Sequence, residues 1–471
     1  MECSMSNLLL GIDCGLTNVK AVVFDEHGKM VQGAERSTPI AAERIDADAL
    51  WKSVAICIKE AVIDLEIAAV CVTGHGNGLY ALDKDCNVII ALPPMGQNEE
   101  VFIREPKVYY GIVRQSAWAG QPLQLLRKVT NEDETLYSQI AHILHCKDYI
   151  RYRLTGRLAT DFSDASASAL IDANTGKYEE LILELCGLRP KEGLLPPILK
   201  GREIAGSVTH EVARFTGLRE GTPVATGLID LDACRIGAGV TESDCLSVTA
   251  GTWGISVSPQ ISVIDSSSIT QNCFSYDDKH RIAVVSAPVS CVNLDWFIRN
   301  FMHGISYAEA ERIAGCYEPD EISVLYLPYL YSDMARPQVK ASFVGMTPET
   351  TLSQMLRGVY EGVLLAHIDQ IKRLQKAGIN VSEIRLSGGA ARSPLWRQLF
   401  ADGFGLPVQT LREKQVGALG SAIMAATAVG LYPNVQTAVE RMVQLDTMTK
   451  PLNAMAYDTK YNKFIELAGE V

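Results

Sequence analysis

The stretch LLLGIDCGLTNVKAVVFD, residues 8–25, decides how the rest of the chain is interpreted. An apolar run at residues 8–12 is followed by a polar turn and by a second apolar run at residues 21–24. The residues between these runs include Asp13, Gly15, Thr17, Asn18 and Lys20. This pattern predicts a strand, a tight turn and a second strand, because glycine lets the backbone bend where a Cβ would clash. Turn amides and hydroxyls can face an anion, and an aspartate at a strand end can hold a cation-bound water. For one isolated match, a plain β-hairpin with an aspartate in its turn is the better interpretation of this stretch.

Length and composition bound the class of protein. The 471 residues exceed a single core and predict roughly two to four domains. A net charge of −12 and a pI of about 5.3 argue against nucleic acid and anionic membranes as main partners. The 12 cysteines are scattered without a CxxC pair, which predicts reduced thiols and a cytoplasmic location. We find no run of about 18 apolar residues, and the first ten residues are too polar for an export signal, so no membrane segment is expected.

A second strand end carries polar side chains among glycines. The apolar run at residues 67–73 leads into the segment GHGNG, residues 74–78. Its three glycines let the backbone lie close to a ligand, while His75 and Asn77 offer hydrogen-bond donors and acceptors. A flexible turn before the next strand, residues 79–82, is an equally good interpretation.

A third strand end lies in GTPVATGLIDLDACRIGAG, residues 221–239. The pattern predicts a short strand that ends at Gly227, followed by Asp230 and a helix of small residues. Asp230 either caps this helix, which is a common role, or is free for chemistry if Asp232 takes the cap.

The opening pattern returns half a chain later. Residues 246–257, LSVTAGTWGISV, again predict a strand, a turn with Gly251 and Thr252, and a strand. This weak internal repeat suggests two related domains whose turns face a shared cleft, where they could clamp a phosphate. Residues 384–393, IRLSGGAARS, predict a strand, the turn Gly388-Gly389 and a helix, and such a turn lets a flat or phosphorylated ligand rest on the backbone.

Several helices follow from apolar spacing and from start and stop signals. They are expected at residues 46–63 with Asp46 or Asp48 as N-cap, at 148–154 with a stop at Thr155-Gly156, at 352–377, and at 413–425, where small residues suit close packing. The last 40 or so residues are expected to be helical with a polar end.

Taken together, these segments resemble the FGGY family of carbohydrate kinases, within the actin/Hsp70/sugar-kinase superfamily, from about Asn7 to about Leu431. The matching motifs are Asp13 to Lys20, Gly227 to Asp230, Gly251 to Trp253, Ala335 to Pro337, the set Gly388, Gly389, Ser393, Trp396, Gln398, Ala401 and Asp402, and Glu413 to Ala422. Each motif alone is weak, but six in the family's order argue against chance. Residues 73–83 and 116–126 look most like L-xylulose and related ketopentose or polyol kinases.

The resemblance implies an α/β fold of two ribonuclease H-like (actin-like ATPase) domains flanking a central cleft. Residues 1–240 would bind the sugar and carry the catalytic aspartate, and residues 241–471 would bind the nucleotide. It implies ATP-dependent phosphorylation of a small sugar or polyol, with a ketopentose such as L-xylulose as the first candidate and Mg²⁺ as cofactor. A homodimer is common in the family. Asp230 is the implied base. The implied nucleotide contacts are Asp13, Gly15, Thr17, Asn18, Lys20, Gly251, Thr252, Gly388, Gly389 and Ala390. The implied sugar contacts are His75, Gly76, Asn77 and Asp230, and Asp13 and Asp230 would hold Mg²⁺ through water.

Three departures from the family pattern leave alternatives open. Leu16 replaces a usual threonine, and Trp253 replaces a commoner serine and would fill part of the cleft. The family's sugar-binding Trp-x-Asp-x-Arg segment is absent after Leu92, where residues 93–110 stand instead. Substitutes for it there are Asn98, Glu99 or Arg104, and a local frameshift in the gene is another explanation. The alternative functions are an FGGY-fold protein that binds nucleotide without phosphorylating sugar, and a chaperone-like or actin-like ATPase.

Overall fold

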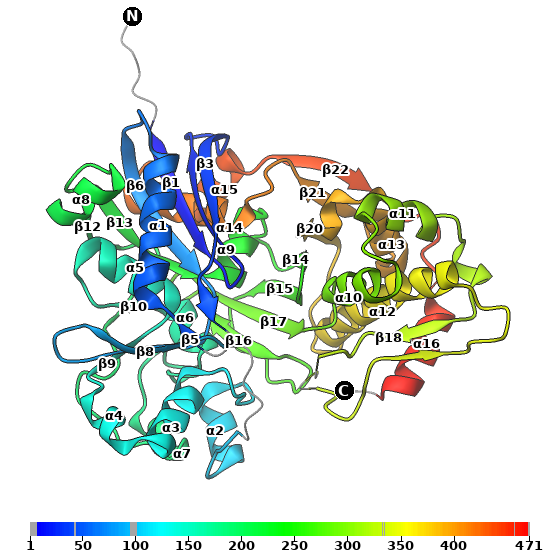
Figure 1. Ribbon diagram of the computed structural model, residues 1–471, viewed down its shortest axis with the longest axis horizontal. Helices are drawn as coiled ribbons and strands as arrows, with labels where there is room; N and C mark the ends of the chain where they lie inside the picture. Colours follow the sequence, from blue (N-terminus) through cyan, green and yellow to red (C-terminus); the bar gives the residue numbers. More distant parts are fainter. Residues whose placement is uncertain are drawn as a thin grey trace, which may run out of the picture.

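The computed structural model describes residues 7–41, 44–94, 101–331, 333, 335–455 and 457–469. Two β-sheets lie side by side, each flanked by helices (Figure 1). The first sheet has the order β12-β13-β6-β1-β2-β3. Its strands are β1 (Leu8–Cys14), β2 (Asn18–Phe24), β3 (Met30–Ser37), β6 (Ile67–Gly74), β12 (Ile204–Ser207) and β13 (Pro223–Ile229).

The second sheet has the order β16-β17-β15-β14-β20-β21-β22. Its strands are β14 (Cys245–Ala250), β15 (Gly254–Gln260), β16 (Gln271–Phe274), β17 (Arg281–Ala287), β20 (Glu383–Ser387), β21 (Val408–Leu411) and β22 (Leu445–Thr449). Strand β22 corrects the expectation that the end of the chain is all helical.

The two sheets repeat one topology. In the first, β1 pairs antiparallel with β2 and parallel with β6, β2 pairs antiparallel with β3, and β6 pairs parallel with β13. In the second, β14 pairs antiparallel with β15 and parallel with β20, β15 pairs antiparallel with β17, and β20 pairs parallel with β21. The repeat predicted from the two hairpins is therefore confirmed.

Helices cover the sheets much as their apolar spacing predicts. Those around the first sheet are α1 (Ala47–Ala61), α5 (Cys146–Thr155), α6 (Phe162–Ala167), α8 (His210–Thr216) and α9 (Asp230–Gly237). Those of the second half of the chain are α10 (Val292–Phe301), α11 (Tyr307–Ala314), α12 (Leu352–Lys376), α13 (Pro394–Phe404), α14 (Val416–Ala428), α15 (Val435–Met442) and α16 (Asp458–Ala468). Asp46 caps α1 through a bond from the Ala49 N–H, and Gly156 ends α5 in the left-handed conformation. In the part of the chain that the structure describes, none of the helices could cross a bilayer.

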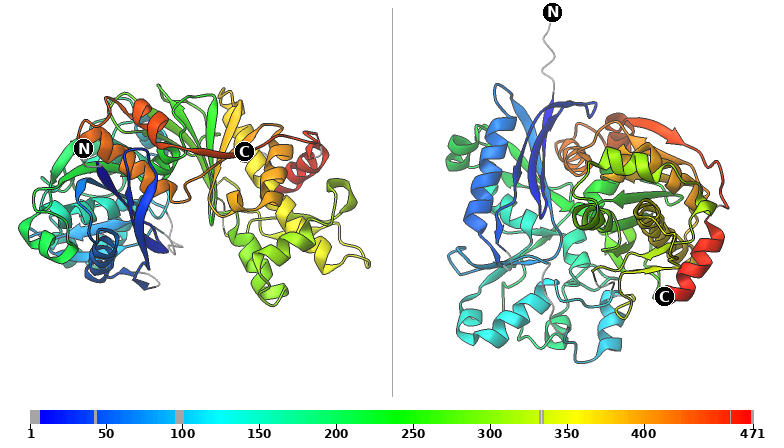
Figure 2. Two further views of the ribbon diagram at one scale, coloured as in Figure 1. Left: turned by 90° about the horizontal axis from the view of Figure 1, so that it is seen from above. Right: turned by 45° about the vertical axis from the view of Figure 1, so that its right-hand side comes forward.

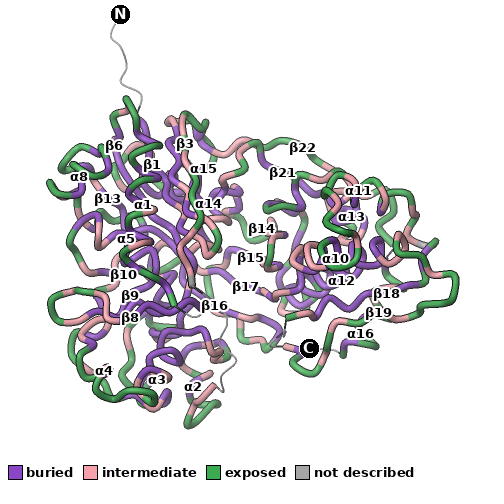
Figure 3. The backbone as a smooth tube through the Cα atoms, in the orientation of Figure 1, coloured by how far each residue is buried: buried purple, intermediate pink, exposed green. Residues whose placement is uncertain are grey.

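Smaller elements complete the fold. A subdomain below the first sheet contains β7 (Leu79–Leu82), β8 (Val88–Leu92), β9 (His142–Leu144), α2 (Pro106–Val113), α3 (Pro122–Glu132), α4 (Glu134–Gln139) and α7 (Glu180–Leu185). The remaining short strands are β4 (Ile40–Ala41), β5 (Arg44–Ile45), β10 (Thr160–Asp161), β11 (Ile198–Leu199), β18 (Leu325–Leu327) and β19 (Ser342–Val344). Buried residues run along the strands of both sheets (Figure 3).

Helix α14 ties the end of the chain to its beginning. Although it follows the second sheet in sequence, it packs on β1 and β6 of the first sheet. Figure 2 shows this crossing of late segments to the lobe that holds the N-terminus. Small residues make the contact possible: a Cβ on Gly11 would lie 1.9 Å from the Ala418 carbonyl oxygen, and one on Gly420 would lie 1.9 Å from that of Ala233. The expected domain boundary near residue 240 stays a prediction, because α14 follows that residue in the sequence but packs on the first sheet.

Candidate active site

Three chemically active residues follow three neighbouring parallel strands. Strands β1, β6 and β13 lie side by side, and the register pairs Asp13 with Thr73 and Thr73 with Leu228. Asp13 lies at the end of β1, His75 directly follows β6, and Asp230 directly follows β13. Since the carboxyl ends of parallel strands share one edge of a sheet, the fold brings these residues together from positions more than 200 residues apart.

Asp13 lies between β1, β2 and α14. A Cβ on Gly417 would come within 2.6 Å of Asp13 Oδ2, so the helix backbone covers one side of this carboxylate. Lys20 lies opposite Asp13 in the β1–β2 register. Burial raises the pKa of Asp13 to about 6, against the opposing effect of Lys20.

Asp230 is the first residue of α9, and its side chain is partly exposed. Its Oδ1 accepts a 2.7 Å hydrogen bond from the Leu231 N–H. Burial, and next the negative charge of Asp13, raise the pKa of Asp230 to about 7, while His75 opposes the shift. Two carboxylates that repel one another in this way form a site that attracts a proton or a cation.

The idea that Asp232 caps α9 is wrong. Asp232 is fully buried and accepts a 2.6 Å bond from Arg235 Nε and another of 2.6 Å from the Ser275 hydroxyl. The N-cap position is Ile229, which provides no side-chain cap. Asp230 is thus left at the helix start, where its carboxylate accepts a hydrogen bond from the Leu231 N–H.

The loop after β6 presents unpaired polar atoms beside Asp230. A Cβ on Gly76 would lie 2.4 Å from Ile229 Cδ1 and 3.8 Å from Asp230 Oδ1, so this loop passes directly over the start of α9. His75 and Asn77 are buried, and in the described chain His75 Nδ1 and Asn77 Oδ1 have no hydrogen-bond partner. Asn77 also adopts a φ of 59°. Such buried orphan atoms are costly unless a ligand or water pairs with them.

His75 also contacts neighbouring polar groups, and these change its pKa. Its Nε2 lies 3.3 Å from the Tyr80 hydroxyl, and its N–H donates to the Cys14 carbonyl at 2.9 Å. Burial alone would lower the pKa of His75, but the neighbouring Cys146 and Asp230 raise it above the ordinary value. The contacts with Tyr80 and the Cys14 carbonyl hold the imidazole in place beside Asp230.

The first glycine turn, residues 15–17, is closed by backbone bonds. The Gly15 N–H donates to the Asn18 carbonyl at 3.0 Å, and the Thr38 hydroxyl donates to the Gly15 carbonyl at 2.7 Å. Asn18 Nδ2 donates to Glu35 at 2.7 Å, which uses one of its two amide hydrogens. Thr17 is exposed, so its hydroxyl is accessible to a phosphate.

The second sheet places its glycine turns at adjoining strand ends. The turn of residues 251–253 joins β14 to β15, and the hydroxyls of Thr249 and Ser387, at the ends of β14 and β20, lie 2.9 Å apart. Gly388 has a φ of +86°, and a Cβ there would lie 2.6 Å from the Ala250 carbonyl oxygen. A Cβ on Gly389 would meet no described atom within 4 Å, whereas Ala390 is buried. The Gly389 backbone is thus open for a ligand to approach.

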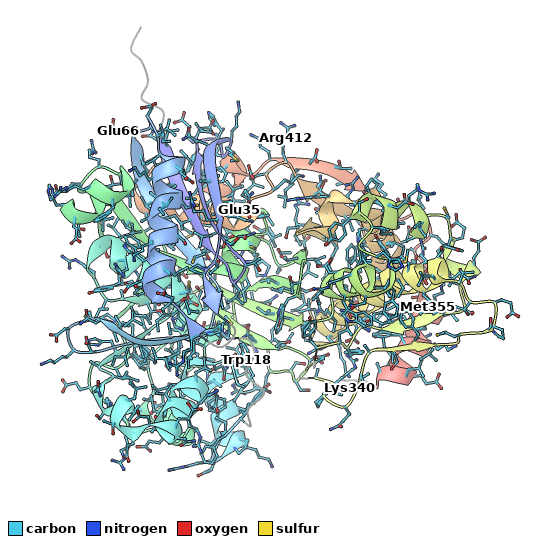
Figure 4. The ribbon with its side chains drawn as sticks, viewed as in Figure 1. Glu35, Glu66, Trp118, Lys340, Met355 and Arg412 are labelled. Carbon is cyan, nitrogen blue, oxygen red and sulfur yellow. The ribbon has the colours of Figure 1, made fainter. Side chains whose placement is uncertain are left out.

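Residues of both lobes line a small cavity. It measures about 60 Å³ and is bounded by Ser116, Trp118, Trp253, Thr270, Gln271, Ser286, Pro288 and Asp333. Trp118 lies where the lower part of the first lobe meets β16 and β17 (Figure 4). Trp253 borders this cavity, and the expectation that it fills part of the cleft stays a prediction. Of the proposed substitutes for the missing sugar-binding segment, Asn98 and Glu99 lie outside the described residues, and Arg104 is exposed beside α7, bonded through its N–H to Leu185.

A buried ionic cluster behind Asp230 was not predicted. Lys147 Nζ lies 2.6, 2.8 and 3.0 Å from carboxylate oxygens of Asp148, Asp161 and Asp164. His145, Asp148 and Asp164 come close enough to suggest a metal site, but the Lys147 ammonium already supplies the cation there. The sequence signal is charge at inward positions of CKDYIR, residues 146–151, next to the run TDFSDAS, residues 160–166.

Two sheets of one topology, with carboxylates at the strand ends of one and glycine turns at those of the other, are typical of kinases with an actin-like fold. The FGGY family of carbohydrate kinases matches the chain with its N-terminal domain over residues 8–237 and its C-terminal domain over residues 246–429. A probable L-xylulose kinase of Pasteurella multocida is 30% identical, covering 98% of both chains. The L-xylulose/3-keto-L-gulonate kinase of Escherichia coli is 28% identical, covering 98% of this chain and 97% of its own.

Solved structures share the fold. A ligand-bound xylulose kinase from Lactobacillus acidophilus superimposes with a TM-score of 0.89 at 22% identity, covering 98% of this chain and 97% of its own. The chain belongs to the FGGY family of carbohydrate kinases. The chain is therefore a sugar kinase that uses ATP. The family match does not favour the two alternative functions, a chaperone-like ATPase and a protein that has lost sugar phosphorylation.

Proposed function

We propose that the chain transfers the γ-phosphoryl group of ATP to a hydroxyl of a ketopentose, with L-xylulose as the first candidate. The observation that carries this proposal is the pair Asp13 and Asp230, partly buried and mutually repelling, beside the orphan polar atoms of His75 and Asn77. Two relatives that match over nearly the whole chain carry L-xylulose in their names, which supports the choice of sugar.

The proposed mechanism gives each residue one task. His75 and Asn77, with the Gly76 backbone between them, hold the sugar against the start of α9. Asp230 accepts the proton of the reacting hydroxyl as its oxygen attacks the γ-phosphorus and the bond to ADP breaks. A pKa of about 7 suits this role, because such a carboxylate is both ionised and basic near neutral pH.

The remaining predicted residues would hold the nucleotide. Gly15, Thr17, Asn18 and Lys20 would face the phosphates from the first sheet, and Gly251 and Thr252 from the second. Adenosine would rest on Gly388, Gly389 and Ala390, where Gly389 is open. Closure of the lobes over both substrates would exclude water from the phosphoryl group.

The same carboxylates fit a magnesium ion. Asp13 and Asp230 offer the hard oxygen donors that Mg²⁺ prefers. Burial raises the pKa of both carboxyls, and the charge of Asp13 adds to the shift of Asp230. When bound, the ion neutralises charge on the ATP phosphates. A cytoplasmic location and a homodimer also belong to the proposal; the free cysteines of the described chain support the first and the family resemblance the second.

A coupled ADP-release assay tests the proposed function. Wild-type protein with ATP and Mg²⁺ is given L-xylulose, D-xylulose, other ketopentoses, polyols and glycerol in turn. We expect sugar-dependent ADP release with the highest kcat/KM on a ketopentose, and a loss of about 10²- to 10⁴-fold in Asp230→Asn. Asp278→Asn, an exposed aspartate paired with Lys200, serves as the matched control and should retain full activity. ATP binding without ADP release on any sugar would refute the proposal.

A further inference from the structure

The peptide group just before the proposed base is held at both ends by side-chain hydroxyls. The Leu228 carbonyl accepts a 2.7 Å hydrogen bond from the Thr73 hydroxyl, and the Ile229 N–H donates a 2.9 Å bond to the Ser163 hydroxyl. This carbonyl and this N–H belong to one peptide unit, so the two bonds together fix its plane. Thr73 and Ser163 are fully buried and come from different elements, β6 and α6.

The strand needs such support at this point. Regular pairing of β13 with β6 shifts between Ala225 and Leu228, and Gly227 in the gap has a φ of +90°. A Cβ on Gly227 would lie 2.1 Å from the Val72 carbonyl oxygen. The backbone therefore leaves its regular strand path immediately before the residues that lead into α9, where small rotations would move the helix start.

The ionic cluster sets the direction of the Ser163 hydroxyl. Asp161 Oδ2 accepts the Ser163 N–H at 2.7 Å and the Ser163 O–H at 2.5 Å, while Asp161 Oδ1 faces Lys147 Nζ at 2.8 Å. Because the hydroxyl proton goes to Asp161, a lone pair of Ser163 Oγ remains for the Ile229 N–H. Asp230 follows Ile229 directly, and its Oδ1 accepts a 2.7 Å hydrogen bond from the N–H of the next residue, Leu231. The orientation of this backbone therefore determines the direction in which the Asp230 carboxylate points.

We propose that Thr73 and Ser163 are positioning residues that orient the Asp230 carboxylate by clamping the Leu228–Ile229 peptide, with Asp161 and Lys147 orienting Ser163. Neither hydroxyl needs to touch substrate. The inference rests on the proposed role of Asp230 as base. It explains why a costly buried charge cluster lies behind the sugar site instead of apolar packing.

Two matched pairs of variants test the clamp in the full-length protein. Thr73→Val removes the hydroxyl and keeps the shape, while Thr73→Ser keeps the hydroxyl. Ser163→Ala removes the second clamp bond, and Ser166→Ala removes a comparable bond on the same helix, since buried Ser166 Oγ accepts the Phe274 N–H at 2.9 Å. Thermal unfolding of each variant checks folding, and kcat and KM are measured with ATP and the best sugar.

We expect kcat to fall about 10- to 100-fold in Thr73→Val and Ser163→Ala, with both KM values within about twofold of wild type. Thr73→Ser and Ser166→Ala should keep kcat within about twofold. Equal kcat in Thr73→Val and Thr73→Ser overturns the clamp, even if Ser163→Ala fails to fold. Equal kcat in Ser163→Ala and Ser166→Ala also overturns it. Asp230→Asn is measured alongside: full activity in that variant refutes the proposed base itself, whereas an inactive Asp230→Asn with equal pairs refutes only the clamp.

Discussion

Replacing Asp230 by asparagine should stabilise the protein at alkaline pH while it abolishes turnover. Burial and the nearby charge of Asp13 raise the pKa of Asp230 from 3.8 to about 7. The folded protein therefore holds this proton more tightly than the unfolded chain does. Stability from this group is fully present below about pH 4 and is lost as the pH rises through about 7. An asparagine at this position carries no such penalty.

The size of the effect follows from the shift. A pKa that rises from 3.8 to about 7 corresponds to about 4 kcal/mol for a fully buried group, at about 1.4 kcal/mol per tenfold change in proton affinity. Asp230 is partly exposed at the protein surface, so solvent screens part of this penalty. We therefore expect Asp230→Asn to gain about 1–2 kcal/mol at about pH 8.5 and less as the pH falls toward about 4.

Urea unfolding of wild type and Asp230→Asn across this pH range measures the gain directly. Asp277→Asn is a control of opposite sign: although burial opposes it, hydrogen bonds from His280 and the Lys279 N–H lower the pKa of Asp277. The stability that Asp277 contributes is therefore present above its ordinary pKa of 3.8 and lost below it, so the difference between wild type and Asp277→Asn should stay level across this pH range. A gain in Asp230→Asn that does not depend on pH, or a loss at alkaline pH, would refute the electrostatic account of Asp230.

Three further predictions concern the same site. Because Asp230 must be ionised to act as base, kcat/KM should fall about tenfold per pH unit below about 7, and a profile that stays flat to about pH 5.5 would contradict this. Gly417→Ala places a Cβ 2.6 Å from Asp13 Oδ2, so we expect the Mg²⁺ concentration for half-maximal activity to rise about tenfold; an unchanged Mg²⁺ titration would show that Asp13 is structural. Gly389→Ala meets open space and should leave the melting temperature unchanged while raising the KM for ATP, whereas Gly388→Ala, at a φ of +86°, should cost about 1–3 kcal/mol of stability. An unchanged KM in Gly389→Ala would exclude adenosine from this turn.

Local chemistry predicted the elements that carry the site. The hairpins at residues 8–25 and 246–257, the Asp46 cap and the Gly156 stop were all readable, since each depends on neighbours within a few residues. The helix around Gly417 was also expected, but not its packing on β1. That contact joins residues about 400 apart and depends on three-dimensional complementarity between glycines and backbone carbonyls.

Two features were not predicted from the sequence, for physical reasons. Charged residues normally mark a solvated surface, so the charges in residues 146–151 and 160–166 did not by themselves show that Lys147 is fully buried among Asp148, Asp161 and Asp164. Strand β22 is an exposed edge strand, so it lacks the apolar alternation that identifies a strand with one buried face. The pairing of its residues with β21 is a tertiary effect.

The central claim is that the carboxylate of Asp230 drives phosphoryl transfer to a sugar hydroxyl. Phosphorus NMR of a reaction with ATP, Mg²⁺ and L-xylulose detects the product itself. We predict a phosphomonoester signal that grows in step with ADP for the wild type and stays at least about 100-fold slower for Asp230→Asn, with ATP still bound by that variant. Inorganic phosphate as the only product of the wild type, or an equal rate of sugar phosphate formation in Asp230→Asn, would contradict the account.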